Sequence, residues 1–212
     1  GPMNSRTTPP GPPAAVAGRS EAPLLNIANA LTVVRLVLVP VFIWLMLRPG
    51  DAVRLAAALV FALAAATDRL DGQLARSRNL VTSFGKIADP IADKALTLSA
   101  FVLLSVAGRL WWWVTALIIV RELGITLMRF VMLRRAVMAA SRGGKLKTAL
   151  QVTGIFGLLM PWAAFLPTAP AAALDLVAYV LVGSALVVTL VTGADYVLKA
   201  LRLSRADPGG RP

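Results

Sequence analysis

Long blocks of apolar residues are the feature that most restricts the fold of this chain. Hydrophobic residues make up 58% of its 212 residues and charged residues only 15%, whereas about a quarter of the residues of an ordinary soluble domain are charged. Apolar blocks of about 20 residues can cross a bilayer as α-helices. Six blocks approach this length: Ile27–Leu47, Val53–Thr67, Asp89–Ala107, Leu110–Leu133, Leu146–Leu166 and Ala172–Leu198. The sequence therefore predicts an all-α, polytopic membrane protein with six transmembrane helices.

The segments outside these blocks define the domain boundaries. Gly1 and Pro2 precede Met3 and match what a protease leaves at an engineered cleavage site, so they are excluded from the fold. Residues 1–23 are rich in Pro, Ala and Gly and predict a disordered tail, and residues 204–212 predict a second one. One membrane domain, residues 24–203, lies between the tails. The second block is short unless its helix continues through polar residues to Ala75.

The net charge of +12 bears on both partners and topology. On a soluble protein it would indicate nucleic acid, but no basic helix lies outside the apolar blocks, so we expect no nucleic-acid partner. Basic residues gather between the second and third blocks, between the fourth and fifth, and after the sixth. The positive-inside rule then predicts that both tails and these loops face the cytoplasm, beside anionic membrane lipid. The Trp111–Trp113 run would lie at the opposite interface.

The chain has no cysteine and no histidine, so any metal site must use oxygen ligands. Such sites suit hard ions such as Mg²⁺, Mn²⁺ or Ca²⁺. Four of the ten acidic residues fall within 26 residues, as two pairs spaced by three and by four positions. On a helix each pair shares one face. The pairs are Asp68 with Asp71, and Asp89 with Asp93.

Carboxylates this close repel each other, and near a membrane they require compensation. Two divalent ions about 3.5–4 Å apart would supply it and suit phosphoryl chemistry. Gly72 and Ala75 lie on the face of the first pair, where they would let a ligand approach, and Arg76 offers a fork for phosphate oxygens. Two alternatives stay open. The acids could pair with basic residues in a solvated loop, or the chain could be an ion-coupled transporter.

The full spacing resembles the signature of the CDP-alcohol phosphatidyltransferase family at all eight fixed positions, Asp68-x2-Asp71-Gly72-x2-Ala75-Arg76-x8-Gly85-x3-Asp89-x3-Asp93. The resemblance implies two Mg²⁺ or Mn²⁺ ions, a homodimer, and a location in the plasma membrane of a bacterium. It implies that Asp68 and Asp89 bridge both ions, that Asp71 completes the first site, and that Asp93 completes the second. Asp93 is also implied as the base that takes the proton of the acceptor hydroxyl.

The resemblance also implies a site for the CDP group of CDP-diacylglycerol. Its residues would be Gly72, Ala75, Arg76, Thr82, Asn29 and Thr32. Many family members have proline where Ala28 stands, so this chain departs from the pattern in its first block. For Asn29 and Thr32 the alternative role is a helix N-cap.

Three further segments resemble the phosphatidylglycerophosphate synthase branch of the family, whose acceptor is sn-glycerol 3-phosphate. They are residues 26–40, 121–129 and 144–151. A phosphate-bearing acceptor needs cations, and the candidates are Arg121, Arg129, Lys145 and Lys147. The lysines could instead be topology anchors, and Arg121 and Glu122 could form a structural ion pair with a neighbouring helix. Inositol phosphate, or phosphatidylglycerol as in a cardiolipin synthase, are the alternative acceptors.

Overall fold

The computed structural model describes residues 27–77, 83–132 and 142–206. Within these ranges the chain forms six α-helices, one short 3₁₀ helix and no strand. The elements are α1 (Ile27–Met46), α2 (Asp51–Ser77), α3 (Ser83–Val106), α4 (Trp112–Met132), α5 (Arg142–Leu159), η1 (Trp162–Ala164) and α6 (Thr168–Ala206). The prediction of an all-α fold is confirmed.

Two helices are longer than the apolar blocks that predict them. The 27 residues of α2 continue through the polar stretch to Ser77, as a full-length second helix requires. The 39 residues of α6 continue past Leu198 to Ala206, and so include the first residues of the segment predicted as a tail. By contrast, α5 ends at Leu159, and η1 occupies part of the remaining fifth block.

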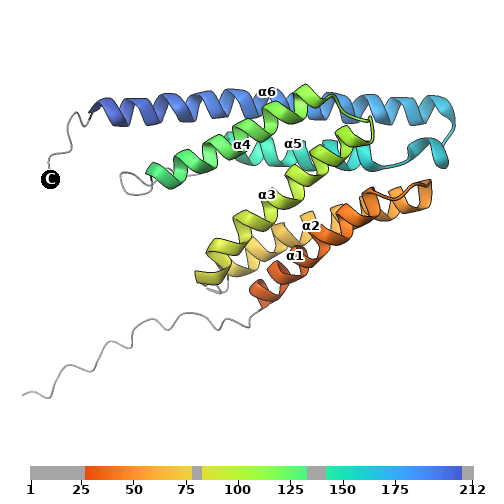
Figure 1. Cartoon of the computed structure of the whole chain (residues 1–212), viewed down its shortest axis with the longest axis horizontal. Coiled ribbons are helices and arrows are strands. Elements are labelled where there is room, and N and C mark those ends of the chain that lie inside the picture. Colours follow the sequence, from red (N-terminus) through yellow and green to blue (C-terminus); the bar gives the residue numbers. More distant parts are fainter. Residues whose placement is uncertain (1–26, 78–82, 133–141, 207–212) are drawn as a thin grey trace, which may run out of the picture.

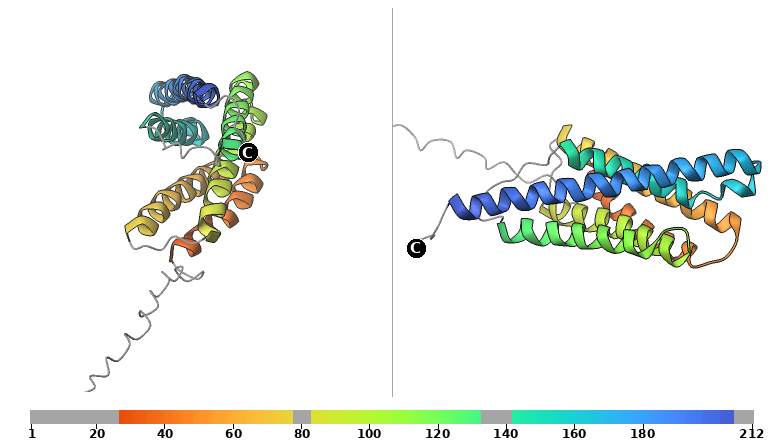
Figure 2. Two further views of the ribbon diagram at one scale, coloured as in Figure 1. Left: turned by 90° about the vertical axis from the view of Figure 1, so that its left-hand side faces the viewer. Right: turned by 90° about the horizontal axis from the view of Figure 1, so that it is seen from above.

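Consecutive helices run in opposite directions, so the bundle has two ends (Figure 1). Helix α1 lies along α2, and α5 lies along α6 (Figure 2). Helix α3 packs against α1 and α4, while α4 packs against α6. The connections 47–50, 107–111 and 160–167 meet at one end, which we call the loop end. The opposite end, where α2 ends and α3 begins, we call the acid end.

Aromatic and aliphatic side chains fill the space between the helices. Phe42 of α1 and Phe61 of α2 are fully buried, with ring centroids 5.8 Å apart. Phe101, Ile118 and Ile155 bring α3, α4 and α5 into the same core. Lipid solvates apolar side chains as well as a core does, so close packing stabilises helix contacts in a membrane. The core therefore fixes the two acid-carrying helices, α2 and α3, against a common support.

Two glycines bring α5 unusually close to α6. A Cβ atom at Gly154 would lie 2.7 Å from Cγ2 of Val182, and one at Gly157 would lie 2.7 Å from Cβ of Ala178. Both distances are shorter than real Cβ contacts, so each position accommodates glycine alone without a shift of its neighbour. Small residues at such contacts are typical of membrane helices, because they let the backbones approach.

The outer surface of the bundle is apolar. Val120, Leu127 and Leu176 are among many large hydrophobic side chains that are exposed there. Large apolar patches are uncommon on soluble monomers, and lipid would cover them. Within the described residues, two helices are long and apolar enough to cross a membrane, at Asn29–Met46 in α1 and Thr168–Arg205 in α6. These features indicate an integral membrane protein.

The other four helices carry more charged residues among their apolar ones, so none of them contains an apolar stretch of that length with so few charges. Helix α4, for example, holds Arg121, Glu122 and Arg129 within 21 residues. Charges inside a membrane are tolerated when they face the bundle interior or a polar cavity and have partners. The six-span topology and its orientation therefore stay predictions, and they depend on how these charges are accommodated.

Candidate active site

The predicted signature lies on two packed helices at the acid end. Asp68 and Asp71 belong to α2, and Asp89 and Asp93 belong to α3, so each acid pair is helical as predicted. Helix α2 contacts α3, and α1 contacts both. The described side chains are those of Asp68 and Asp93. Outside the description lie the side chains of Asp71, Gly72, Ala75, Arg76 and Asp89, and all of Thr82, so the roles of these residues stay predictions.

Asp68 forms an ion pair with Arg35 of α1, in which Nη1 of the arginine donates to Oδ1 of the aspartate. The Arg35 side chain is fully buried, whereas that of Asp68 is 34% exposed. A guanidinium buried in an apolar helix bundle requires compensation by carboxylate or other acceptor oxygens. The contact therefore ties α1 to the acid-carrying part of α2 and leaves part of Asp68 accessible.

Asp93 lies half-buried on α3, one position before Lys94. Its backbone carbonyl accepts a hydrogen bond from Oγ1 of Thr97 at 3.0 Å. The carboxylate itself has no hydrogen-bond or ion-pair partner among the described side chains. The charged groups whose fields act on it are Arg35, Lys94, Lys147 and Glu122. Within the described residues, Asp93 is thus a carboxylate without a fixed partner, and three of the four charged groups that act on it are cations.

Glu122 is the centre of a buried cluster that we call the Glu122 cluster, with Lys94, Arg121 and Lys147 as its other members. Glu122 itself is 5% exposed. Its Oε2 accepts a hydrogen bond from Nζ of Lys94 at 2.9 Å, and its Oε1 accepts one from Nζ of Lys147 at 2.5 Å. Nη1 of Arg121 lies 3.4 Å from Oε1. Three cations around one carboxylate leave an excess of positive charge between α3, α4 and α5, which favours an anion there.

The arginines of α4 are also bound to α6. Nε of Arg121 donates to the carbonyl of Thr189 at 3.0 Å, and Nη2 donates to Oγ1 of Thr192 at 3.1 Å. Arg129 lies over the ring of Tyr196, with 5.4 Å between the guanidinium carbon and the ring centroid. These contacts hold α4 against α6 and occupy much of the hydrogen-bonding capacity of Arg121.

The four cations predicted to bind the acceptor therefore do not all lie in one cluster of contacts. Lys147 and Arg121 belong to the Glu122 cluster, so the structural ion-pair alternative for Arg121 and Glu122 is present in the structure. Arg129 is on the α6 side, and Lys145 is exposed near the start of α5. Of these four residues, Lys147 is the one whose field reaches Asp93 among the described groups.

Asn29 and Thr32 lie inside α1, on its buried side. The helix begins at Ile27, so neither residue takes the position that precedes it, and the N-cap alternative is wrong. Asn29 is 4% exposed and Thr32 is 1% exposed. They lie within two turns of Arg35 on the same helix, near the acid end. Their predicted contact with the CDP group stays a prediction.

The donor set suits hard divalent ions. Asp68 and Asp93 present carboxylate oxygens from two packed helices, and the side chains of both are partly accessible. Among the described side chains there is no group of three or more acids that could hold a metal. The other two acids of the signature, Asp71 and Asp89, lie on the same helices, but their side chains are not among the described ones. Oxygen ligands without histidine or cysteine fit Mg²⁺ or Mn²⁺.

Sequence reasoning missed three residues that the structure brings to this region. Arg35 and Lys94 contact Asp68 and Glu122 respectively. Gln151 of α5 is buried, and its Nε2 has no hydrogen-bond partner among the described residues. A signal for Arg35 was available, because it is a single charge inside the apolar first block. Lys94 follows Asp93 directly, but nothing in the sequence links it to Glu122.

These features define an all-helical membrane protein whose partly accessible aspartates lie beside a buried excess of positive charge. The profile of the family described as CDP-alcohol phosphatidyltransferase matches residues 25–194, which is most of the chain. The chain therefore belongs to the CDP-alcohol phosphatidyltransferase family, as its signature predicts, and it is an enzyme of that class.

Three bacterial relatives match this chain over most of their own length. The probable phosphatidylglycerophosphate synthase of Mycobacterium tuberculosis (strain H37Rv) is 45% identical over 198 residues, covering 92% of this chain and 88% of the relative. The CDP-diacylglycerol–glycerol-3-phosphate 3-phosphatidyltransferase of Bacillus subtilis (strain 168) is 37% identical over 150 residues, covering 65% and 78%. The enzyme with the same name in Escherichia coli (strain K12) is 41% identical over 140 residues, covering 63% and 76%.

Proposed function

We propose that the chain transfers the phosphatidyl group of CDP-diacylglycerol to sn-glycerol 3-phosphate, which gives phosphatidylglycerophosphate and CMP in phospholipid biosynthesis. The observation that carries this proposal is the position of Asp93 beside the Glu122 cluster. A base and an excess of positive charge are what an alcohol that bears a phosphate group requires. The names of the relatives, at 37–45% identity, point to the same two substrates.

In this reaction Asp93 accepts the proton of the acceptor hydroxyl. The hydroxyl oxygen forms a bond to the lipid-side phosphorus of CDP-diacylglycerol, the bond from that phosphorus to the CMP oxygen breaks, and CMP leaves. Lys147 holds the phosphate of glycerol 3-phosphate, with Arg121, Arg129 and Lys145 as further candidates. Gly72, Ala75, Arg76, Thr82, Asn29 and Thr32 hold the CDP group.

Asp68, Asp71, Asp89 and Asp93 would hold two Mg²⁺ or Mn²⁺ ions. When bound, these ions would neutralise the diphosphate and stabilise the leaving oxygen. Arg35 holds Asp68 in place from α1, so it acts as a positioning residue for that carboxylate. We further propose six membrane spans, with both termini and the acid end in the cytoplasm, and a homodimer as in other members of the family.

Other acceptors remain the second candidate, because inositol phosphate also needs cations and phosphatidylglycerol is a lipid alcohol. The test uses purified protein with CDP-diacylglycerol, Mg²⁺ and each acceptor in turn, with CMP release and lipid mass spectrometry as readouts. We expect phosphatidylglycerophosphate from glycerol 3-phosphate, and no turnover in EDTA. If glycerol 3-phosphate gives no lipid product, the acceptor is wrong. If no acceptor releases CMP while sealed vesicles show ion flux, the enzyme reading is wrong and the transporter alternative is supported.

A further inference from the structure

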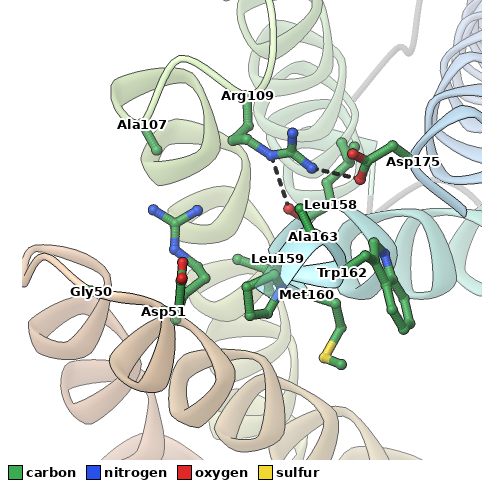
Figure 3. Close-up of a pocket in the computed structure, with 12 residues that line it drawn as sticks. Gly50, Asp51, Ala107, Arg109, Leu158, Leu159, Met160, Trp162, Ala163 and Asp175 are labelled. Carbon is green, nitrogen blue, oxygen red and sulfur yellow. Dashed lines mark hydrogen bonds and ion pairs between the residues drawn. The ribbon is translucent and has the colours of Figure 1, made fainter. Parts of the chain in front are cut away.

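A cavity of about 300 Å³ opens at the loop end of the bundle, the end away from the carboxylates (Figure 3). It is lined by the start of α2, the connection that follows α3, the end of α5, and parts of η1 and α6. Its polar walls carry Arg54, Arg109, Asp51 and Asp175. The remaining lining is largely apolar and includes Leu159, Met160 and Trp162.

Arg109 is held in place by two contacts of its side chain. Its Nη2 donates to Oδ1 of Asp175 at 2.8 Å, and its Nε donates to the carbonyl of Leu158 at 3.3 Å (Figure 3). Its own backbone carbonyl accepts a hydrogen bond from the hydroxyl of Tyr179 at 2.5 Å. Arg109 therefore forms a fixed positive wall of the cavity, and its charge is balanced by Asp175.

Arg54 is in a different situation. It lies in the first turn of α2, half-buried, and its guanidinium makes no hydrogen bond or ion pair with any described residue. Asp51, one turn earlier, attracts it through space without contact and is itself exposed to solvent. Arg109 repels it. A partly buried guanidinium without an acceptor is costly, and an oxyanion in the cavity would satisfy it with charge-assisted hydrogen bonds.

We propose that this cavity is a second phosphate-binding site, distinct from the catalytic one, in which Arg54 recognises the phosphate of a phospholipid headgroup. A cationic wall beside apolar side chains matches a ligand that joins a phosphate to hydrocarbon. The exposed side chains of Trp111, Trp112 and Trp113 lie at the same end, as aromatic side chains do at the level of lipid headgroups. A free phosphate ion carries the same chemistry, so the experiment must separate the two sources.

The test compares Arg54→Gln with Arg48→Gln in the full-length protein. Arg48 is an exposed arginine at the same end that lies over Trp44, at 4.0 Å, and does not line the cavity. Retained lipid is counted by native mass spectrometry in detergent, with phosphatidylglycerol, diacylglycerol or inorganic phosphate as the probe. CMP release by each variant reports that its catalytic site is folded.

We expect Arg54→Gln to weaken retention of one phosphatidylglycerol by about tenfold or more, with CMP release unchanged, while Arg48→Gln behaves as the wild type. Diacylglycerol, which lacks the phosphate, should not be retained at this site. Binding of inorganic phosphate that depends on Arg54, without lipid retention, would assign the site to the free anion. Equal retention in both variants, or retention of diacylglycerol equal to that of phosphatidylglycerol, would overturn the proposal. If Arg54→Gln does not fold, Arg54→Lys keeps the charge but loses the fork, and it must still weaken retention severalfold.

Discussion

Nζ of Lys147 lies 2.5 Å from Oε1 of Glu122, so a buried ion pair holds the beginning of α5 against the middle of α4. Lys147 also contributes to the field at Asp93. One lysine therefore belongs both to a structural contact and to the surroundings of the proposed base. The two roles can be separated by substituting each partner in turn.

Substitution Glu122→Gln should destabilise the fold. It removes the carboxylate that Lys147 and Lys94 contact, and removing one member of a buried ion pair costs about 3–5 kcal/mol. The measurement is thermal unfolding in detergent. Asp195→Asn is the matched control, because Asp195 forms an exposed pair with Lys199 on α6, worth at most about 1 kcal/mol. Equal losses of stability in both variants would contradict a special role for the Glu122 cluster.

Substitution Lys147→Met should raise the KM for glycerol 3-phosphate by about ten- to a hundredfold, because a charge-assisted contact to phosphate is worth about 1.5–3 kcal/mol. The KM for CDP-diacylglycerol should barely move. Glu122 keeps Lys94 as a partner in this variant, so the fold should persist. Lys199→Met, at an exposed position of α6, is the control. An unchanged KM for glycerol 3-phosphate would return Lys147 to the role of topology anchor.

Substitution Asp93→Asn should abolish turnover while the protein still binds CDP-diacylglycerol. The amide cannot accept the proton of the acceptor hydroxyl, whereas the side-chain volume is nearly unchanged. Steady-state CMP release and lipid binding are measured side by side. Asp175→Asn, which alters the ion pair with Arg109 at the loop end, serves as the comparison. Activity within tenfold of the wild type, a barrier change of about 1.4 kcal/mol or less, is too high for loss of an essential base.

Substitution Gly154→Ala should lower stability by about 1–3 kcal/mol, because the new methyl group would overlap Val182 across the contact between α5 and α6. Gly183→Ala is the matched control, since a Cβ there meets nothing within 4 Å. The control should be neutral or slightly stabilising, as alanine is the better helix former. The stability of both variants is measured by thermal unfolding. A loss of stability of the same size in both would mean that the close contact between α5 and α6 is unimportant.

Single cysteines test the six-span topology, and the natural absence of cysteine keeps the background low. Replacements of Leu47 and Phe165 at the loop end should react with an impermeant reagent on one side of the membrane. A replacement of Arg202, near the end of α6, should react from the cytoplasmic side. Reaction of positions 47 and 202 from the same side would exclude six spans.

Much of the site could be predicted because it depends on local spacing. The intervals of three and four residues place each acid pair on one helical face wherever the helices pack, and both pairs are helical in the structure. The length of α2 was also predictable, since a span that ends at Thr67 is too short to cross a bilayer.

Partners that are distant along the chain could not be predicted. Arg35 meets Asp68 across 33 positions, and Lys94 meets Glu122 across 28. The sequence shows that a buried charge needs compensation, but not which opposite charge supplies it. The same limit applies to Gly154 and Gly157, which have meaning only when α6 lies against them.

The Glu122 cluster has a consequence for how the protein is made. During synthesis α4 emerges before α5, so Glu122 reaches the membrane with Lys94 but without Lys147. In the six-span arrangement, Arg121 also lacks its acceptors on α6 at that stage. Charged side chains of this kind oppose the transfer of a lone helix into lipid. Helix α4 should therefore stay at the insertion machinery until the last two helices arrive, so that the C-terminal half enters the bilayer as one cooperative unit.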